Sequence, residues 1–571
     1  MSLLAVLLQD ESFKFSEDHL DEIKNMLTPN SRKENSQFYH ERLFALATEG
    51  VQLHTFSKGR YTLVIDGVIT NIAELYEKLK EAGVTLQNSS DTEIIAQLFI
   101  ENKTDFTQKI DGAFVFLLWD NEEKTLIGGV DPFGKYQLYF RESAEELIFA
   151  TEKNSMYFSH YEEQLDDFAF HHYFDYKYIP EPHTFTQGIK RIPKGHFFIK
   201  EQNNPIQFFP YYDFPRSEDS GVEGTLVKGK EIFRETVHFQ LALNENNGLI
   251  VRDDLADLAL AHIAKQYDEN LTLFSASHEE NNPFARQVAE ELSLEHIHVT
   301  ITPQALMEEL PKIMSLLEDP FTQPDIVTNY FIAKEAEGRV DSLLSSLGAE
   351  PGLGNYVEGK NILSRVGKLL RKSKETKEHF LPLFSDSMKR KLFTRFGSVD
   401  PDVLRFYEEV KGLDQRTRRQ FIELNSSFPN IALQPIRKVI ESQGLTLHTP
   451  FISKKLLEVV HSLPTEQRAR NELSLSIVSE RFSVQKVRRL TRDKVAEIPY
   501  DKWLRIDCFD WAIEFIKGSE IDDYLSKEEV LKLFYSFKEK KNVDFQIVWS
   551  ILMFVLWHVV FVEKDFLNTL K

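Results

Sequence analysis

Three aspartates at the junction between a strand and a helix are the most chemically distinctive residues of this 571-residue chain. Asp253, Asp254 and Asp257 follow an apolar strand that ends near Val251, and an apolar helix begins at Leu255. Carboxylates at a helix N-terminus accept hydrogen bonds from free backbone N–H groups and interact favourably with the helix dipole. The same negative charges oppose the binding of a polyanion such as a phosphate chain. The junction therefore favours a stable helix start over an anion site.

The elements that position this junction alternate between strand and helix. Strands are predicted over Leu249–Val251, Thr272–Phe274 and His298–Thr302, and helices over Val227–Leu243, Leu255–Tyr267 and Pro283–Leu292. Such an alternation is typical of right-handed βαβ units and a parallel sheet. From about residue 360 nearly all of the pattern is helical, and the basic cluster Arg365–Arg395 is interpreted as a solvated helix face.

The first 212 residues have a different pattern, in which short apolar strands are broken by turns. Strands are predicted over Tyr61–Ile65, Ala113–Leu118, Leu126–Val130 and Leu147–Ala150, and helices over Asn71–Glu81 and Thr92–Asn102. Met1–Leu8 is interpreted as a buried first strand, and Asp66-Gly67 and Asp111-Gly112 as turns. Three prolines and the polar run 217–221 indicate a linker. We therefore expect an α+β or sandwich domain followed by an α/β domain.

The composition argues against several classes of function. Lys and Arg total 68 and Asp and Glu total 89, so the net charge of −21 disfavours nucleic-acid binding and docking on an anionic membrane. The single cysteine, Cys508, excludes an internal disulfide and predicts a reducing, cytoplasmic location. The apolar run Ile547–Val562 is shorter than the roughly 20 residues of a membrane span, so it predicts a buried helix. The apolar start lacks the basic segment of a secretory signal.

Short strings along the chain are more specific than its element pattern. In the first part they are His40–Leu43, Asp66–Asn71, Ser90–Glu93, Asp111–Phe114, Asp131–Gly134, Ala150–Glu152, Tyr178–Thr184 and Ile192–His196. These strings resemble the class II glutamine amidotransferase domain of the asparagine synthetase B family. Those similar to its ATP-pyrophosphatase domain are Asp319–Phe321, Pro450-Phe451, Trp503-Leu504 and Trp549–Trp557. The resemblance implies an αββα sandwich of the N-terminal-nucleophile type over residues 1–212 and a linker over 213–225. A parallel-sheet ATP-pyrophosphatase domain with a helical C-terminal extension is implied over 226–571.

The family's glutaminase reaction needs an N-terminal cysteine thiolate, whose own α-amino group acts as the base. Here Ser2 follows Met1, and the glycine that follows the family's cysteine is replaced by Leu3. A serine hydroxyl is the weaker nucleophile, so Ser2 is either an altered nucleophile or, as we favour, the plain start of a strand.

Part of the family's glutamine clamp remains in the sequence. Arg42 matches the arginine that pairs with the substrate α-carboxylate, and Asp91 matches the carboxylate that holds its α-ammonium group. The family's Asn-Gly-Glu is replaced by Asp66-Gly67-Val68, which places a carboxylate where a tetrahedral oxyanion would form. Arg42 and Asp91 are therefore open to two readings, as a substrate clamp or as ordinary surface ion-pair residues.

The family's ATP site is the part that has changed most. Its loop Ser-Gly-Gly-Leu-Asp-Ser aligns with Arg252, Asp253, Asp254, Leu255, Ala256 and Asp257. Leu347 stands at the metal-facing aspartate and cannot bind magnesium, while Glu350 replaces a second aspartate and Thr446 the catalytic glutamate. Only Lys494 matches the lysine that would neutralise the transition state, and its alternative role is a solvated basic residue. No metal site is predicted.

Three functions fit this combination of a retained scaffold and altered sites. The favoured hypothesis is a pseudoenzyme without cofactors that acts as a structural or regulatory partner, in a homodimer or with an active paralogue. The first alternative is a divergent amide ligase that uses ATP and magnesium with ammonia or an amine, around Lys494. The second is a sensor of glutamine or asparagine that uses Arg42 and Asp91.

Overall fold

The structure is a computed structural model of the chain. It describes residues 3–9, 16, 36–39, 43–47, 51–86, 88–156, 164–201, 204–215, 222–355, 382–395, 397, 399, 405–406, 408–490 and 497–563. The chain divides into two compact units. Unit 1 comprises residues 1–169 and 179–214, and unit 2 comprises residues 170–178 and 215–571.

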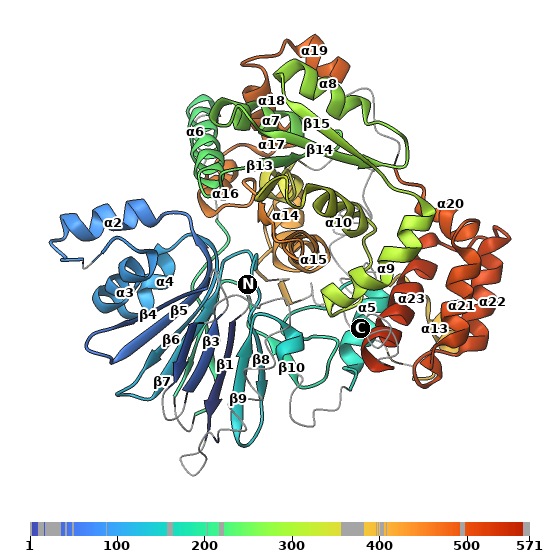
Figure 1. The fold of residues 1–571 in the computed structure, drawn as a ribbon, viewed down its shortest axis with the longest axis horizontal. Coiled ribbons are helices and arrows are strands. Elements are labelled where there is room, and N and C mark those ends of the chain that lie inside the picture. The colour runs from blue at the N-terminus through green and yellow to red at the C-terminus, as the bar shows by residue number, and fades with distance from the viewer. Residues whose placement is uncertain are drawn as a thin grey trace. The chain divides into compact units, whose positions relative to one another are not determined.

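Unit 1 contains two antiparallel sheets, each with six strands among the described residues (Figure 1). The first sheet has the order β10 (Ile189–Arg191), β8 (Tyr139–Glu142), β9 (Glu146–Ala150), β1 (Leu3–Leu8), β3 (Leu43–Ala47) and β2 (Ser36–Tyr39). The second has the order β12 (Gln207–Pro210), β11 (His196–Lys200), β7 (Thr125–Val130), β6 (Gly112–Asp120), β5 (Tyr61–Ile69) and β4 (Gln52–Phe56).

The two sheets of unit 1 share one apolar core, to which β1 contributes Leu3, Ala5 and Leu7. A second core lies between the β4–β7 sheet and the helices α2 (Ile72–Glu81), α3 (Asp91–Asn102) and α4 (Phe106–Lys109). The other helical segments that the structure describes up to residue 176 are η1 (Lys103–Asp105), η2 (Lys153–Met156) and α5 (Asp167–Tyr176). These layers follow from strands that are apolar on the face turned to the partner sheet.

Unit 2 is built on a parallel sheet of order β15 (Glu295–Thr300), β14 (Thr272–Ser277), β13 (Asn247–Ile250), β16 (Ser342–Ser345) and β17 (Thr446–His448). Helices before and within the sheet segment are α6 (Val222–Leu241), α7 (Leu255–Tyr267), α8 (Pro283–Leu292), α9 (Pro303–Leu317), α10 (Asp325–Ala336) and α11 (Ala349–Leu353). Helices α6, α7 and α8 contribute to one core beside the sheet, while α10 packs on β14 and β15 (Figure 1). The sheet confirms the predicted mixed α/β fold class.

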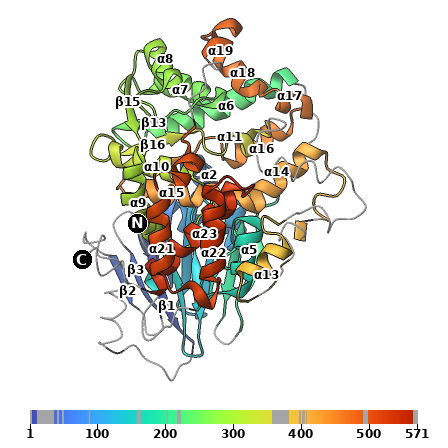
Figure 2. The same ribbon diagram turned by 90° about the vertical axis from the view of Figure 1, so that its right-hand side faces the viewer.

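Among the described residues after α11, the elements of unit 2 are helices, apart from β17. Its helices are α13 (Asp386–Leu392), α14 (Gln415–Asn425), η5 (Pro429–Leu433), α15 (Gln434–Glu441), α16 (Lys454–His461), α17 (Thr465–Ala469), α18 (Glu472–Val478), α19 (Val484–Leu490), α20 (Tyr500–Arg505), α21 (Phe509–Gly518), η6 (Ile521–Asp523), α22 (Lys527–Lys538), α23 (Phe545–Trp557) and η7 (His558–Val562). Helices α21, α22 and α23 pack together (Figure 2).

The apolar C-terminal run forms α23 and η7. The 18-residue stretch Phe545–Val562 is apolar enough to pass as a membrane span by length and composition, and it is the single such helix among the described residues. Of the residues in this stretch, 78% are buried inside the protein, as expected for a core helix. The predicted buried helix is therefore confirmed.

Two predicted turns, at Asp66-Gly67 and Asp111-Gly112, are wrong. Asp66-Gly67 does not form a turn, because Gly67 lies inside β5 and pairs with Phe114 of β6. Gly67 has φ +121°, and an added Cβ would lie 2.1 Å from the Ala113 carbonyl oxygen. Asp111-Gly112 is not a tight turn either, since Gly112 pairs with Ile69. The two glycines allow two strands to approach each other closely. An Asp-Gly dipeptide is compatible with this role as well as with a turn, so the sequence alone does not separate the two.

The other differences concern strand ends and unit boundaries. The strand expected over His298–Thr302 begins earlier, at Glu295, and β17 was missed within a region expected to be helical. Helix α6 begins at Val222, inside the predicted 213–225 linker. The basic cluster from residue 365 lies mostly outside the described residues, and its described end includes α13.

Candidate functional site

The carboxyl ends of β13 and β16 are where a parallel α/β sheet normally places its ligand. The two strands are neighbours, and Ile250 pairs with Ser345 at this edge. The residues that follow them, from Arg252 to Asp254 and from Ser346 to Gly348, therefore lie close together. This edge is the candidate functional site of unit 2.

The loop after β13 satisfies its own backbone donors with carboxylates. The backbone N–H groups of Arg252 and Asp254 donate to Oδ2 of Asp257, at N···O distances of 2.9 Å and 3.3 Å. The N–H of Asp257 donates in return to Oδ1 of Asp254, at 2.8 Å, which completes a capping box at the start of α7. A helix start with free N–H groups can bind phosphate. Here an internal carboxylate occupies these donors.

A chain of side-chain contacts closes the same loop over the next strand. Nη2 of Arg252 donates to Oγ of Ser346 at 3.0 Å, and that hydroxyl donates to Oδ1 of Asp257. Nδ2 of Asn282 donates to the Arg252 carbonyl oxygen at 3.0 Å. The loops after β13, β14 and β16 are thus joined through one arginine. We call the set Arg252, Asp254, Asp257 and Ser346 the acidic lock.

Burial and charge determine the protonation of this lock. Asp257 has no exposed surface. Burial raises the pKa of its carboxyl group, and the nearby charge of Asp254 raises it further, against the opposing effects of Arg252 and Ser346. Asp253 and Asp325 add further negative charge around Arg252. The edge therefore holds one guanidinium group among several carboxylates.

The other residues singled out around this site are placed differently. Ala256 is buried in the first turn of α7, and Leu347 is a buried apolar residue whose N–H donates to Oγ of Ser345 at 3.1 Å. Oε1 of Glu350, in α11, lies 3.7 Å from Nη2 of Arg419. Thr446 pairs with Ser342 at the opposite end of β16. The structure therefore brings the lock residues together near Leu347 but does not bring Thr446 to them.

Two residues that bond to Arg252, Ser346 and Asn282, were not anticipated from the sequence. Asn282 before Pro283 is a recognisable helix cap, and its Oδ1 does accept from the N–H of Ala285 at 2.9 Å. The cap signal predicts the hydrogen bond between Asn282 Oδ1 and the Ala285 N–H. It does not predict the hydrogen bond from Asn282 Nδ2 to the Arg252 carbonyl oxygen, 30 residues earlier in the chain.

The candidate glutamine site of unit 1 is only partly described. Ser2 and Arg42 lie outside the described residues, and so does Lys494 of unit 2. Asp91 begins α3 and is partly exposed. Burial raises the pKa of its carboxyl group, while a hydrogen bond from the Gln52 side chain lowers it. Asp91, to which the resemblance assigns a substrate ammonium group, thus has a protein partner in Gln52.

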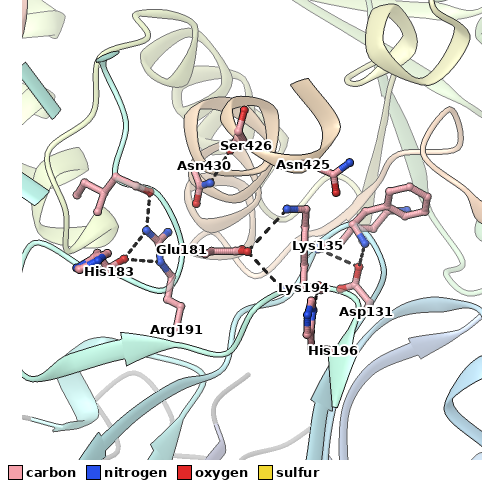
Figure 3. Close-up of polar contacts among 12 residues, drawn as sticks. Asp131, Lys135, Glu181, His183, Arg191, Lys194, His196, Asn425, Ser426 and Asn430 are labelled. Carbon is pink, nitrogen blue, oxygen red and sulfur yellow. Dashed lines mark hydrogen bonds and ion pairs between the residues drawn. The ribbon is translucent and has the colours of Figure 1, made fainter. Parts of the chain in front are cut away.

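Polar side chains that bond to loop backbone or to one another occupy three of the other matching strings of unit 1, at Asp131, Glu181 and Lys194 (Figure 3). The Asp131 carboxylate accepts from the N–H groups of Phe133 and Tyr136 at 2.9 Å and 3.0 Å. Oε2 of Glu181 faces Nζ of Lys194 at 3.7 Å and accepts weakly from the Lys194 N–H (Figure 3). These side chains hold loops in place.

Aromatic side chains connect the matching strings of unit 2. The ring of Trp549, in α23, lies 6.4 Å from that of Phe321 and 5.8 Å from that of Tyr500. Tyr500 in turn lies 5.8 Å from Trp503. Strings far apart in the chain thus meet in one packed cluster, which is a property of the scaffold.

Comparison with known proteins assigns two parts of the chain to two different family models. Residues 31–212 match the family model described as glutamine amidotransferase domain, and residues 259–559 match the model described as asparagine synthase. The chain is 25% identical over 577 residues to asparagine synthetase [glutamine-hydrolyzing] 1 of Bacillus subtilis, covering 94% of this chain and 91% of that protein. It is 21% identical over 478 residues to asparagine synthetase [glutamine-hydrolyzing] 3 of the same organism, covering 77% and 76%. With the asparagine synthase model spanning more than half of its length, the chain belongs to the asparagine synthetase family.

Proposed function

We propose that this protein is a non-catalytic member of the asparagine synthetase family that acts as a structural or regulatory partner of another protein. The acidic lock is the observation that carries the proposal. A nucleotide would have to displace the Asp257 carboxylate from the N–H groups of Arg252 and Asp254 and from the Ser346 hydroxyl.

Electrostatics oppose that exchange. A phosphate at the start of α7 would lie beside Asp254 and Asp257, with Asp253 close by. One like-charge pair at about 5 Å is unfavourable by roughly 1 to 3 kcal/mol at effective dielectric constants of 80 to 20. The lock replaces an external anion by an internal one, so the helix start is satisfied without a ligand.

The state of the single cysteine supports the same view of the glutaminase reaction. Cys508 is buried, and burial raises the pKa of its thiol to about 12, with Asp507 adding to the shift. A thiol with such a pKa is not a thiolate at neutral pH, so it does not supply a nucleophile. The proposal therefore involves neither glutamine hydrolysis by a cysteine nor a bound cofactor.

Isothermal titration of the purified full-length protein with magnesium-ATP tests the proposal directly. We expect no heat of binding up to millimolar ATP, with an active glutamine-hydrolysing asparagine synthetase as the positive control. Micromolar binding would contradict the proposal. It would favour the divergent ATP-dependent amide ligase, and the release of AMP with ammonia or amine acceptors would then be assayed.

The partner side of the proposal needs a second measurement. The family resemblance favours a homodimer, or a heterodimer with an active paralogue, in the cytoplasm. Native mass spectrometry of the protein alone, and of the protein mixed with such a paralogue, would detect either assembly. A monomeric mass in both samples, together with an unchanged synthetase activity of the paralogue, would count against a structural or regulatory role.

A further inference from the structure

Nine residues of the chain belong to a different unit from the residues on either side of them. Residues up to Ala169 and from Ile179 belong to unit 1, whereas Phe170–Tyr178 belong to unit 2. Most of these residues form the larger part of α5. The chain therefore passes between the units three times, at residues 169–170, 178–179 and 214–215.

The segment Phe170–Tyr178 is part of an aromatic core in unit 2. Phe174 has no exposed surface, and its ring lies 5.2 Å from that of Phe384, 5.1 Å from Phe393 and 5.5 Å from Phe554. Phe170 lies 5.4 Å from Phe554. Helix α5 accordingly lies beside α13 and α23 (Figure 2). Burial of aromatic rings in this number is a major source of packing energy.

Polar contacts fix the same segment in register. The buried hydroxyl of Tyr173 donates to the Ser550 carbonyl oxygen at 2.9 Å. Nζ of Lys389 donates to Oδ2 of Asp175 at 2.8 Å, and both side chains are almost completely buried. The Leu383 N–H donates to the Asp175 carbonyl oxygen at 2.8 Å. Charges buried in this way require a fixed partner, so the segment has one docked position.

We propose that α5 is an internal anchor, by which the chain of unit 1 completes the core of unit 2 and stays joined to it independently of the 213–225 linker. The proposal rests on the contacts of residues 170–178 within unit 2 and does not depend on the proposed function. A unit that lacks this segment loses buried aromatic rings and half of a buried ion pair, so the two chain parts should stay associated after the linker is cut.

A full-length protein with a specific protease site inserted in residues 216–221 tests the anchor. After cleavage, we expect the two fragments to elute together in size-exclusion chromatography and to separate only in denaturant. Phe174→Ala should weaken the association of the fragments at least about 100-fold, because a buried Phe-to-Ala change removes several kcal/mol of packing. Phe168→Ala is the matched control on the same helix, since Phe168 packs on His183 within unit 1.

Each outcome decides the matter. Separation of the cleaved wild-type fragments in native buffer would overturn the proposal. So would equal association of the Phe174→Ala and Phe168→Ala proteins, since other surfaces would then hold the fragments together. If uncleaved Phe174→Ala fails to fold, Tyr173→Phe replaces it. That variant loses only the bond to Ser550, and we expect it to weaken association about 5-fold.

Discussion

At the scale of single residues, the lock at the carboxyl edge of the unit 2 sheet satisfies its hydrogen-bonding groups with internal contacts. Asp257 accepts from two backbone N–H groups and from Ser346, so both of its oxygens are occupied. These acidic residues supply the capping box that satisfies the backbone N–H groups at the start of α7.

Replacing Asp257 should therefore destabilise unit 2. Asp257→Ala leaves two backbone N–H groups and the Ser346 hydroxyl without their acceptor, and we expect a loss of about 3 kcal/mol in the free energy of unfolding. Asp253→Ala is the matched control, because Asp253 takes no part in the lock, and it should change stability by less than about 0.5 kcal/mol. Urea denaturation at pH 7 measures both variants. Equally small losses in the free energy of unfolding of the two variants would mean that the lock does not stabilise unit 2.

Gly67 gives a second prediction at this scale. Gly67→Ala would place Cβ 2.1 Å from the Ala113 carbonyl oxygen and also retain a left-handed backbone at φ +121°. Gly59→Ala is the control, since Gly59 has φ +87° but no heavy atom within 4 Å of the added Cβ. We expect Gly59→Ala to cost about 1 kcal/mol and Gly67→Ala at least about 3 kcal/mol. Thermal melts of both variants would contradict this account if the two losses were the same.

At the scale of elements, α5 and α13 are joined by a buried ion pair whose energy depends on pH. Burial raises the pKa of Asp175 to about 6, although Lys389 lowers it. A carboxyl group with a raised pKa binds its proton more tightly in the folded state. Its contribution to stability therefore decreases as pH rises from about 4 through about 6.

Lys389→Met should make this dependence visible. Without its cation, the buried Asp175 is costly when ionised, and we expect a loss of about 3 kcal/mol at pH 7 that becomes smaller at pH 5 as Asp175 takes up a proton. Asp175→Asn has no carboxyl group at this position, so it lacks the decrease in stability that the wild type shows as Asp175 ionises. Its loss relative to the wild type should therefore become smaller at pH 7 than at pH 5, which is the opposite trend. Denaturation of both variants at pH 5 and pH 7 measures the difference. A loss in Lys389→Met that is the same at both pH values would contradict the assignment.

Local patterns predicted those elements whose ends carry their own signals. Helices α7 and α8 begin and end as expected, because Asp254 and Asn282-Pro283 are caps that act through neighbouring residues. Strand β17 was missed because it has only three residues. So short a segment shows no alternation of apolar and polar residues that would separate it from the helices predicted around it. The strand role of Gly67 depends on a partner more than 40 residues away, which no local pattern contains.

The same limit applies to the candidate site and to α5. The resemblance placed Arg252, Asp254 and Asp257 at one loop, and their capping role followed from residue type. The bond of Arg252 to Ser346 depends on the neighbouring strand of a parallel sheet, so it could be found only in three dimensions. The assignment of residues 170–178 to unit 2 likewise depends on side chains 200 and more residues away.

At the scale of the whole molecule, the net charge of −21 is the dominant long-range property. Like charges spread over a folded surface repel one another, and unfolding relieves that repulsion by moving them apart. Salt screens this effect, because the Debye length falls from about 30 Å at 0.01 M to about 8 Å at 0.15 M ionic strength. Buried groups such as Asp257 and Asp175 are screened far less than exposed ones.

Added salt should therefore stabilise the wild-type protein. Between 0.01 M and 0.15 M sodium chloride we expect a gain of about 1 kcal/mol, or roughly 2–4 °C in the melting temperature of a domain-sized unit. Choline chloride at the same ionic strength should have the same effect, because screening does not depend on the cation. Sucrose at equal osmolality acts through exclusion from the protein surface, so it separates charge screening from a general solute effect. The loss caused by Asp257→Ala should not change with salt, because that carboxylate is buried. A melting temperature that falls with salt would mean that surface ion pairs outweigh the excess of carboxylates.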